Sequence, residues 1–388
     1  MQGPSVSPSA PHPTALRRIA WVTPDYPPDH GGVSDHSFAM VSVLRAAGHD
    51  VLVLATPQKR GFARLHADLA AYGPDLVIVA YTPLGYAART FGISPAFTLW
   101  CAALRKRLGC RVTLLAHEAS LPVGYFWQSR EFKLAALAAL QVAQFSVLAA
   151  SFDTVLFSNS STRLWWAELL PRLAERFHTI RICSNIPVHF SSDPEAELAA
   201  SGFSVPSPTI LFFGTGHPSV LFDYVEEAFR ALLELEPSAG LVIVGMNAER
   251  LRELRPTLAG LGAKVQALGY LPAEQVSLWL RVAKLVLAPL IEGISARKGT
   301  VMAALQHGQT VITTRGVCTL DDVAWSQICL LAPLDRRAFA DAAVAAFRDP
   351  ERGAAVGRAA RSEYDANASA TVTASRILEH ANRPDSRC

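Results

Sequence analysis

Short apolar runs alternate with stretches of helical periodicity along most of this chain. The apolar runs cover residues 18–23, 51–55, 75–81, 112–116, 154–157 and 179–182 in the first half, and 209–213, 240–245, 265–268, 285–289 and 310–314 in the second. Continuous apolar runs separated by helices are typical of parallel strands, because such strands are buried on both faces. The alternation therefore predicts an α/β fold with parallel sheets covered by helices.

The chain of 388 residues is too long for one ordinary hydrophobic core, which predicts two α/β domains. We expect Rossmann-like domains over residues 17–188 and 209–365, joined by a linker over 189–208. Residues 1–16 are rich in Pro and Ser and lack the apolar core of a signal peptide, so we expect a disordered tail. Residues 366–388 would form a C-terminal helix and tail.

Charge and cysteine content exclude several classes of function. The net charge of +3 gives no reason to expect a nucleic-acid partner. Residues 1–190 hold 17 basic and 11 acidic residues, a mild excess that would favour an anionic membrane surface. The six cysteines form no CxxC pair and no cluster with zinc spacing. We expect free thiols in a reducing, cytoplasmic setting, with no metal and no cofactor.

A glycine loop follows the first predicted strand, in the sequence PDYPPDHGGVSDHS. Its prolines force a loop, and Gly31 and Gly32 permit close approach of the backbone to a ligand. Ser34 or Asp35 would cap the helix that follows, which ends near Gly48. A strand, a glycine loop and a helix start are the usual phosphate-binding geometry of such sheets, although most Gly-Gly pairs only serve turns.

The strand over 112–116 ends in His117 and Glu118. The carboxyl ends of parallel strands border the ligand crevice in open α/β sheets, so both side chains are candidates for a site. The alternative is a histidine that is merely hydrogen-bonded at a strand end.

Residues 292–314, EGISARKGTVMAALQHGQTVITT, contain the most informative pattern. The spacing predicts a helix over 295–306, with Ser295 as N-cap and Gly308 at its end. Arg297 and Lys298 would then lie in the first turn, where cations oppose the helix dipole by roughly 0.3–1 kcal/mol each. Free N–H groups and two cations at one helix start suit an anion such as a diphosphate. The alternative is a solvated basic turn.

Residues 131–150, EFKLAALAALQVAQFSVLAA, form an apolar segment of helical length. Its charged and amide residues make it a poor membrane span, and we expect a helix buried on one face and covered by loops. The alternative is an interfacial contact with a membrane, to which the preceding Tyr125, Phe126 and Trp127 would contribute.

The 292–314 segment resembles the donor-site signature of retaining glycosyltransferase family 4, which has the GT-B fold. The signature is Glu-Gly, a helix, and a run into His-Gly-x-x-Val-Ile-x-Thr. The sequence TPDYPPDHGGVSDHSFAMVSVLRAAGHDVLVLA resembles the opening of the same family. The resemblance extends over about residues 17–365. It implies two facing Rossmann-like domains, the first for the acceptor and the second for a nucleotide diphosphate sugar, with the C-terminal helix folded back on the first domain.

The resemblance also implies roles for individual residues. Gly31 and Gly32 would face the donor diphosphate, His117 would lie near the donor sugar, and Glu292 would contact its hydroxyl groups. Gly245, Gly269 and Tyr270 lie at strand ends where the base and ribose would rest. Ser295 would also belong to the donor site.

The sequence departs from the family pattern at two places. The second domain opens with GTGHPS, which offers Gly214, Gly216 and His217 but none of the family's diphosphate-binding Arg and Lys. Thr300 stands where the family has a second Glu that binds the ribose. We therefore hypothesise that Arg297 and Lys298 supply the missing positive charge without a metal.

These features together predict a hexosyltransferase-type enzyme that transfers a sugar with retention of configuration and without a protein nucleophile. The acceptor would be a carbohydrate or a lipid-linked molecule, reached by peripheral membrane contact at the inner face of the membrane. Two alternatives are a non-catalytic nucleotide-sugar-binding partner of another transferase and a GT-B sugar-nucleotide epimerase.

Overall fold

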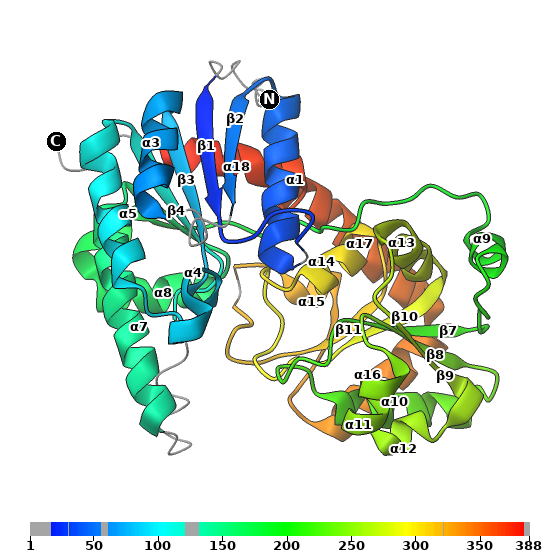
Figure 1. The fold of residues 1–388 in the computed structure, drawn as a ribbon. Helices are drawn as coiled ribbons and strands as arrows, with labels where there is room; N and C mark the ends of the chain where they lie inside the picture. Colours follow the sequence, from blue (N-terminus) through cyan, green and yellow to red (C-terminus); the bar gives the residue numbers. More distant parts are fainter. Residues whose placement is uncertain (1–16, 30, 56–60, 121–131, 321, 384–388) are drawn as a thin grey trace, which may run out of the picture.

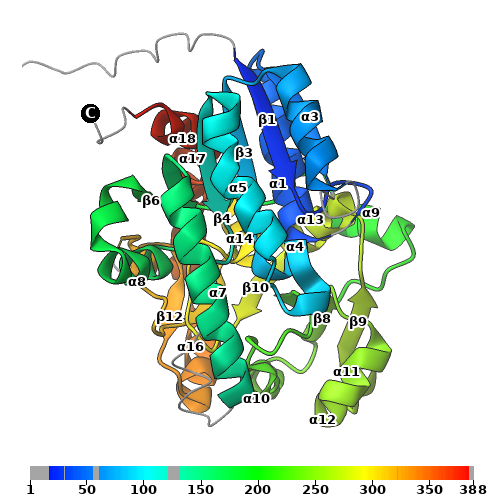
Figure 2. The ribbon, with the colours of Figure 1, turned by 60° about the vertical axis from the view of Figure 1, so that its left-hand side comes forward.

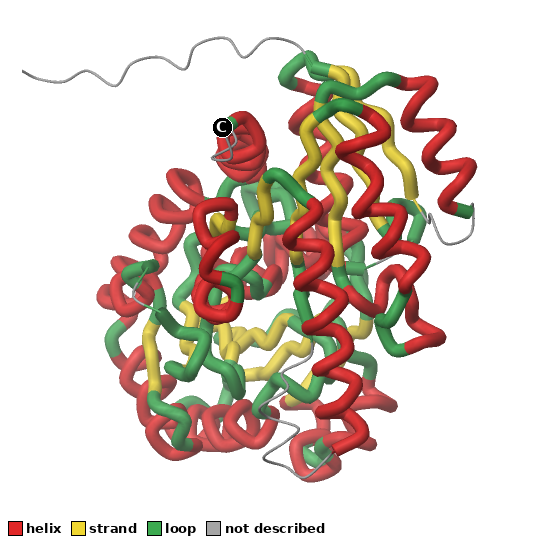
Figure 3. Tube along the Cα trace, turned by 90° about the vertical axis from the view of Figure 1, so that its left-hand side faces the viewer, coloured by secondary structure: helices red, strands yellow, loops and turns green. Residues whose placement is uncertain are grey.

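In a computed structural model that describes residues 17–29, 31–55, 61–120, 132–320 and 322–383, the chain forms two domains, each built on a parallel sheet (Figure 1). This confirms the predicted α/β architecture. The expected disorder of residues 1–16 and the aromatic loop at 125–127 lie outside the described residues. Figure 3 shows the two sheets as separate groups of strands, each surrounded by helices.

The first sheet has the strand order β2-β1-β3-β4-β5-β6. Its strands are β1 (Arg18–Thr23), β2 (Asp50–Ala55), β3 (Leu76–Tyr81), β4 (Arg111–Ala116), β5 (Thr154–Phe157) and β6 (Phe177–Thr179). All pairs are parallel. The order reverses between β1 and β3, and a crevice forms at such a reversal, beyond the carboxyl ends of the strands.

Helices cover both faces of this sheet. They are α1 (Gly32–Ala46), α3 (Phe62–Tyr72), α4 (Pro83–Ala87), α5 (Pro95–Leu108), α7 (Phe132–Ser151) and α8 (Ser160–Leu169), with short 3₁₀ turns at Ala88–Thr90 and Pro171–Arg176. Alternate residues of β1 serve opposite cores: Trp21 packs with Met40 of α1, whereas Val22 belongs to the cluster of Phe97 and Phe145 from α5 and α7. The period of two along a doubly covered strand explains this division.

The second sheet has the order β12-β11-β10-β7-β8-β9, again parallel throughout. Its strands are β7 (Thr209–Phe213), β8 (Gly240–Val244), β9 (Val265–Gly269), β10 (Ala283–Ala288), β11 (Val311–Thr314) and β12 (Leu330–Ala332). The helices are α10 (Phe222–Leu235), α11 (Ala248–Leu254), α12 (Pro256–Ala259), α13 (Ala273–Val282), α14 (Gly299–Gln306), α15 (Trp325–Ile328), α16 (Arg336–Arg348) and α17 (Pro350–Asn367), with a 3₁₀ turn at Gly262–Lys264.

The last helix, α18 (Ala370–Asn382), returns to the first domain (Figures 1 and 2). Its residues Ala374, Ile377 and Leu378 share a buried cluster with Ile19 and Trp21 of β1. The chain therefore crosses between the domains twice, once after β6 and once between α17 and α18. The segment between the domains contains a short helix, α9 (Pro194–Ala200).

The helix after the glycine loop begins earlier than predicted. It starts at Gly32, and Gly31 is its N-cap without a side-chain hydrogen bond. Ser34 lies inside the first turn, and its hydroxyl donates to the carbonyl oxygen of Asp29 at 2.6 Å. The prediction of a Ser34 or Asp35 cap was therefore wrong, because Ser34 ties the loop to the helix instead.

Three further boundaries differ from the prediction. The sixth strand is Phe177–Thr179 rather than 179–182, because the next residues pair with the second domain: the N–H of Ile182 donates to the carbonyl of Ala296 at 3.2 Å. Residues 248–261 have helical periodicity, which predicts one helix, but Pro256 divides them into α11 and α12. Proline lacks the N–H that a continuous helix needs. The helix predicted over 295–306 starts at Gly299 instead.

Candidate active site

The glycine loop of the first domain leads into α1 at the end that points toward the second domain (Figure 1). A Cβ atom built at Gly31 or Gly32 would meet no described atom within 4 Å. The backbone there is open to a ligand. Next to it, the Asn185 amide donates to the Asp35 carboxylate at 2.7 Å, which places the start of α1 beside the chain that leaves the first domain.

Three predicted glycines of the second domain come together at the ends of β7, β8 and β9. Gly245 has φ +98°, and a Cβ there would lie 2.8 Å from the carbonyl oxygen of Gly214. The N–H of Gly245 donates to the Gly269 carbonyl at 2.7 Å. Only glycine fits the Gly245 position, because both its φ and its closeness to Gly214 exclude a side chain.

A hollow of about 390 Å³ opens at these strand ends. It is lined by Thr215, Gly216, His217, Gly245, Met246, Asn247 and Arg250. Two of these residues, Gly216 and Gly245, were predicted for the donor site. Arg250 was not, since it lies in α11, 34 residues beyond Gly216 in the chain. The Arg250 guanidinium thus lines the hollow, and its Nη1 pairs with the Glu253 carboxylate at 2.9 Å.

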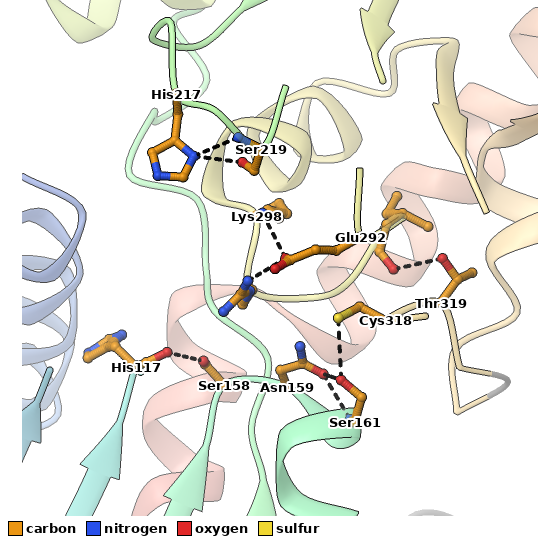
Figure 4. A network of polar contacts seen from close by, with 12 residues as sticks. His117, Ser158, Asn159, Ser161, His217, Ser219, Glu292, Lys298, Cys318 and Thr319 are labelled. Carbon is orange, nitrogen blue, oxygen red and sulfur yellow. Dashed lines mark hydrogen bonds and ion pairs between the residues drawn. The ribbon is translucent and has the colours of Figure 1, made fainter. Parts of the chain in front are cut away.

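Glu292, Arg297 and Lys298 form a compact ionic cluster, of which Glu292 and Lys298 are labelled in Figure 4. The Glu292 carboxylate lies 2.6 Å from Arg297 Nη2 and 3.6 Å from Lys298 Nζ. The side chains of Glu292, Arg297 and Lys298 are 34 %, 25 % and 17 % exposed, so the cluster is partly buried and still accessible to a ligand. Its two cations share one carboxylate.

The loop before α14 fixes this cluster. The Leu290 N–H donates to Thr314 Oγ1 at 2.8 Å, and the Thr314 hydroxyl donates to the Leu290 carbonyl at 2.5 Å. The N–H of Ile294 donates to the Thr314 carbonyl at 3.0 Å. Gly293 has φ +77° and packs against the backbone of Gly316, where no side chain would fit. The Ile182 N–H donates to the Ala296 carbonyl at 3.2 Å, and the Lys298 N–H donates to the Ser295 carbonyl at 3.3 Å, so residues 294–298 form a loop with one turn before the helix. Ser295 is consequently not its N-cap; Lys298 is.

Burial and neighbouring charges shift the pKa values in the cluster. Burial acts to raise the pKa of Glu292, but Arg297 and Lys298 outweigh it and hold that pKa below its usual value. Burial, and next Arg297, lower the pKa of Lys298, and Glu292 only partly offsets them. An additional anion near Lys298 would therefore relieve an electrostatic cost that is present in the free protein.

His117 follows β4, and its contacts are within the first domain. Its carbonyl accepts from the Ser158 hydroxyl at 3.0 Å, and its ring meets His36 of α1 edge-on at 4.9 Å between centroids. Nε2 of His117 and both ring nitrogens of His36 are buried without a hydrogen-bond partner among the described residues. Burial lowers the pKa of His117 to about 4 and that of His36 well below its ordinary value. No described contact joins His117 to the Glu292 cluster.

The remaining predicted residues lie at different places. Thr300 is in the first turn of α14, Tyr270 follows β9 with 75 % of its surface exposed, and the exposed Glu118 accepts from Thr82 at 3.4 Å. Ser295 is 3 % exposed and lines a separate hollow between the domains.

A backbone hydrogen bond between two loops connects the hollow at the ends of β7 and β8 with the ionic cluster. The His217 ring and Ser219 share hydrogen bonds of 2.8 and 3.1 Å, and the Ile291 N–H donates to the Ser219 carbonyl at 3.0 Å (Figure 4). The loop that borders the hollow thus abuts the loop that carries Glu292. The five described cysteines are free thiols, and across the described residues no group of three or more His, Cys, Asp or Glu side chains is arranged to hold a metal ion.

Comparison with protein families matches residues 207–349 to the model described as glycosyl transferases group 1. The matched residues span β7 to the end of α16 and thus contain both the hollow and the ionic cluster. The first domain lies outside the match. A comparison with curated proteins found no match.

Solved structures resemble the whole chain. A sucrose-phosphate synthase from Thermosynechococcus elongatus superimposes with a TM-score of 0.70 at 18 % identity, over 94 % of this chain and 98 % of that one. WaaG, a glycosyltransferase involved in lipopolysaccharide biosynthesis, gives 0.67 at 14 % identity, over 94 % and 100 %. HepE from Anabaena in complex with UDP-glucose gives 0.65 at 14 % identity, over 94 % and 98 %. The chain has the GT-B fold.

We predict that the buried histidine pair makes stability depend on pH. Unfolded His117 takes up a proton near its ordinary pKa of 6.5, whereas the folded group does so only at about 4. Stability should therefore be full above pH 6.5 and decline as the pH falls toward 4. Urea unfolding at a series of pH values should show a smaller decline for His117→Gln than for the wild type. Parallel curves for the two proteins would contradict this assignment.

Proposed function

We propose that this protein is a glycosyltransferase that moves a sugar, in hexosyl transfer, from a nucleotide diphosphate sugar to an acceptor, with retention of configuration. The ionic cluster at the start of α14 supports this proposal most directly. Two cations and the free N–H groups of a helix start lie at one point, within the part of the chain that matches the glycosyl transferases group 1 model. The HepE complex shows that this fold holds UDP-glucose in another protein.

Arg297 and Lys298 would bind the leaving diphosphate. In the free protein Glu292 neutralises part of their charge at 2.6 and 3.6 Å. A diphosphate carries more negative charge than one carboxylate, so it can draw both cations away from Glu292. The freed carboxylate would then accept hydrogen bonds from hydroxyl groups of the sugar. This exchange lowers the cost of placing an anion in a sheltered site, because the cations are already oriented.

The charge that develops on the leaving group increases as the glycosidic bond breaks. Cations that bind this group stabilise the transition state more than the ground state, which is what raises the rate. In the proposed reaction the acceptor attacks from the face that the diphosphate leaves, and a diphosphate oxygen takes the acceptor proton. The two side-chain cations would replace a metal ion, and no cofactor enters the scheme.

The hollow at the ends of β7 and β8 would hold the nucleotide. Gly216, Gly245 and the adjacent Gly269 bring backbone close to it, and Arg250 adds a positive charge at its border. Tyr270, which follows β9, and Thr300, in the first turn of α14, would contact the base and the ribose. The open backbone of Gly31 and Gly32 would face the diphosphate from the first domain, with His117 on the same edge.

The exposed face of α7 supports peripheral contact with a membrane. α7 is the one helix among the described segments that is long and apolar enough to cross a bilayer, and it is buried along only one side. Its exposed residues are Phe132, Lys133, Ala136, Ala139, Leu140, Ala143, Val147 and Ala150. They form a continuous stripe, and every one except Lys133 is apolar.

The charges on the two packed helices are positive. α5 lies against α7 and carries Arg105, Lys106 and Arg107, and neither helix contains a carboxylate. Asp153, just after α7, pairs with Arg105 at 3.0 Å, which leaves Lys106 and Arg107 beside it. An apolar stripe on a helix whose neighbour carries cations suits an anionic leaflet surface. We therefore place the protein in the cytoplasm at the inner face of the membrane, where the acceptor would be a carbohydrate or a lipid-linked molecule.

We predict binding and turnover of a nucleotide sugar. Calorimetric titration with a panel of uridine, guanosine and adenosine diphosphate sugars should identify a binder, and mass spectrometry should then show its hydrolysis or transfer. Binding without either reaction would instead indicate a non-catalytic partner of another transferase. Conversion of the donor to its epimer without an acceptor would indicate an epimerase.

We predict that Arg297→Ala abolishes turnover and leaves folding nearly unchanged, because the side chain is part-exposed and supports no packing core. Loss of one charge from the diphosphate site should lower kcat/KM by about a hundredfold or more. Arg352→Ala, on the exposed start of α17, provides the matched control. An unchanged kcat for Arg297→Ala with the identified donor would refute its role.

We predict that α7 carries the membrane contact. The wild type should co-sediment with vesicles of phosphatidylglycerol and phosphatidylethanolamine but not with vesicles of phosphatidylcholine. Leu140→Glu changes a side chain that is 58 % exposed and should weaken sedimentation without affecting stability. Leu334→Glu, at a 46 % exposed leucine of the second domain, should have no effect. Equal sedimentation of the three proteins would refute this contact.

A further inference from the structure

A hollow of about 110 Å³ lies between the two domains, apart from the nucleotide hollow. We call it the hinge hollow. The first domain contributes the start of α8 and the residues around β6, and the second contributes the loops before α14 and after β11. α18 closes it with Arg376.

Two buried polar groups in its lining have no partner among the described residues. Asn159 is 4 % exposed, and its Nδ2 is unbonded although its Oδ1 caps α8. Ser295 is 3 % exposed, and its Oγ is likewise unbonded. A buried polar atom without a hydrogen bond costs about 1–3 kcal/mol, so both groups are arranged for a partner that fills the hollow.

The lining offers more donors than acceptors. Arg181 is held by Glu363 at 2.6 Å, and Arg376 is held by the backbone and side chain of Asn367 at 3.1 and 2.6 Å. These bonds use few of the donors of each guanidinium, and they fix its direction. The N-terminus of α8 lies at the same hollow and adds the positive end of a helix. One carboxylate lines the space, that of Asp322, and Ser160 donates a hydrogen bond to it.

We propose that the hinge hollow binds an oxyanion of about the size of phosphate. Two oriented guanidinium groups, the Asn159 amide, the Ser295 hydroxyl and a helix N-terminus are the donors that a tetrahedral oxyanion takes. The group is either a free inorganic phosphate or the phosphate of an anionic acceptor, and the second source rests on the proposed glycosyl transfer.

The bound anion would also connect the two domains. Asn159 and Arg181 belong to the first domain, whereas Ser295 lies two residues before Arg297 on the loop that carries the ionic cluster. A ligand shared by these elements stabilises the arrangement in which the domains touch. Because coupling between two sites is reciprocal, an occupied hinge hollow should tighten donor binding by the same factor as the donor tightens anion binding.

Calorimetric titration of the full chain with inorganic phosphate tests the site. Asn159→Asp is the sharpest variant, since a carboxylate oxygen replaces the unbonded Nδ2 while Oδ1 still caps α8. Arg376→Gln removes a charge from the opposite side. Both should weaken phosphate binding by about tenfold or more. The control is Arg358→Gln, an exposed arginine of α17, which should bind as the wild type does.

The Glu292 cluster also attracts phosphate, so the titration is repeated with Arg297→Gln. Binding that survives in Arg297→Gln and is lost in Asn159→Asp and Arg376→Gln supports the proposal. Binding that is lost only in Arg297→Gln, or equal in all variants, overturns it. Phosphate binding by a protein that binds no nucleotide sugar would support the hinge hollow and contradict the proposed function.

A second arm separates the sources of the anion. Sugar phosphates are titrated beside the corresponding free sugars. If sugar phosphates bind and inorganic phosphate does not, with the same loss in Asn159→Asp, the hollow receives the acceptor's phosphate. If inorganic phosphate binds as tightly as any sugar phosphate, the site takes the free ion. If neither binds to the wild type, the proposal is refuted.

Discussion

The loop from Ile294 to Ala296 determines how the rest of the site is arranged. Thr314 holds it on one side, and Ile182 of the first domain holds it on the other, each through one backbone hydrogen bond of 3.0 and 3.2 Å. Ala296 and Arg297 form a turn in which the Lys298 N–H donates to the Ser295 carbonyl at 3.3 Å, and α14 begins at Gly299. Arg297 and Lys298 consequently precede the helix and face Glu292. The same two bonds couple the position of the cations to the contact between the domains.

The architecture was predictable because it depends on local pattern. Fully buried strands such as Leu76–Tyr81 need continuous apolar runs, and those runs can be read without knowledge of their neighbours. The predicted boundaries were wrong where hydrogen bonds to residues outside the element determine where a helix or strand begins or ends. Ser34 bonds to Asp29 rather than capping a helix, and Ile182 leaves the strand because Ala296 pairs with it. The break at Pro256 is different, since a proline inside a helical pattern indicates the end of a helix from the sequence alone.

The site residues also divide into those that are close in the sequence and those that only the fold brings together. Glu292, Arg297 and Lys298 are within seven residues of one another, so sequence reasoning could group them. Arg250 could not be found in this way, because only the fold of β8 and α11 brings it to the loop that contains Gly216. The hinge hollow is more remote still, since Asn159, Ser295 and Arg376 come from three separate parts of the chain. The local sequence pattern identifies a charged turn, but only the contacts made in the folded protein determine which residues the turn faces.

The two edges of the proposed cleft differ in their electrostatics, and this difference suits group transfer. On the first domain, burial lowers the pKa of His36 and His117 and keeps both rings neutral at pH 7, because burial disfavours the charged form of each ring. On the second domain, the cluster retains two cations for one carboxylate. Positive charge is therefore concentrated where a leaving diphosphate would lie and is absent from the histidine pair on the opposite edge. An incoming hydroxyl near that pair would meet no fixed cation that competes for its lone pairs. The asymmetry favours charge flow from acceptor to leaving group, and it follows from ionisable rings without an acidic partner on one edge and paired charges on the other.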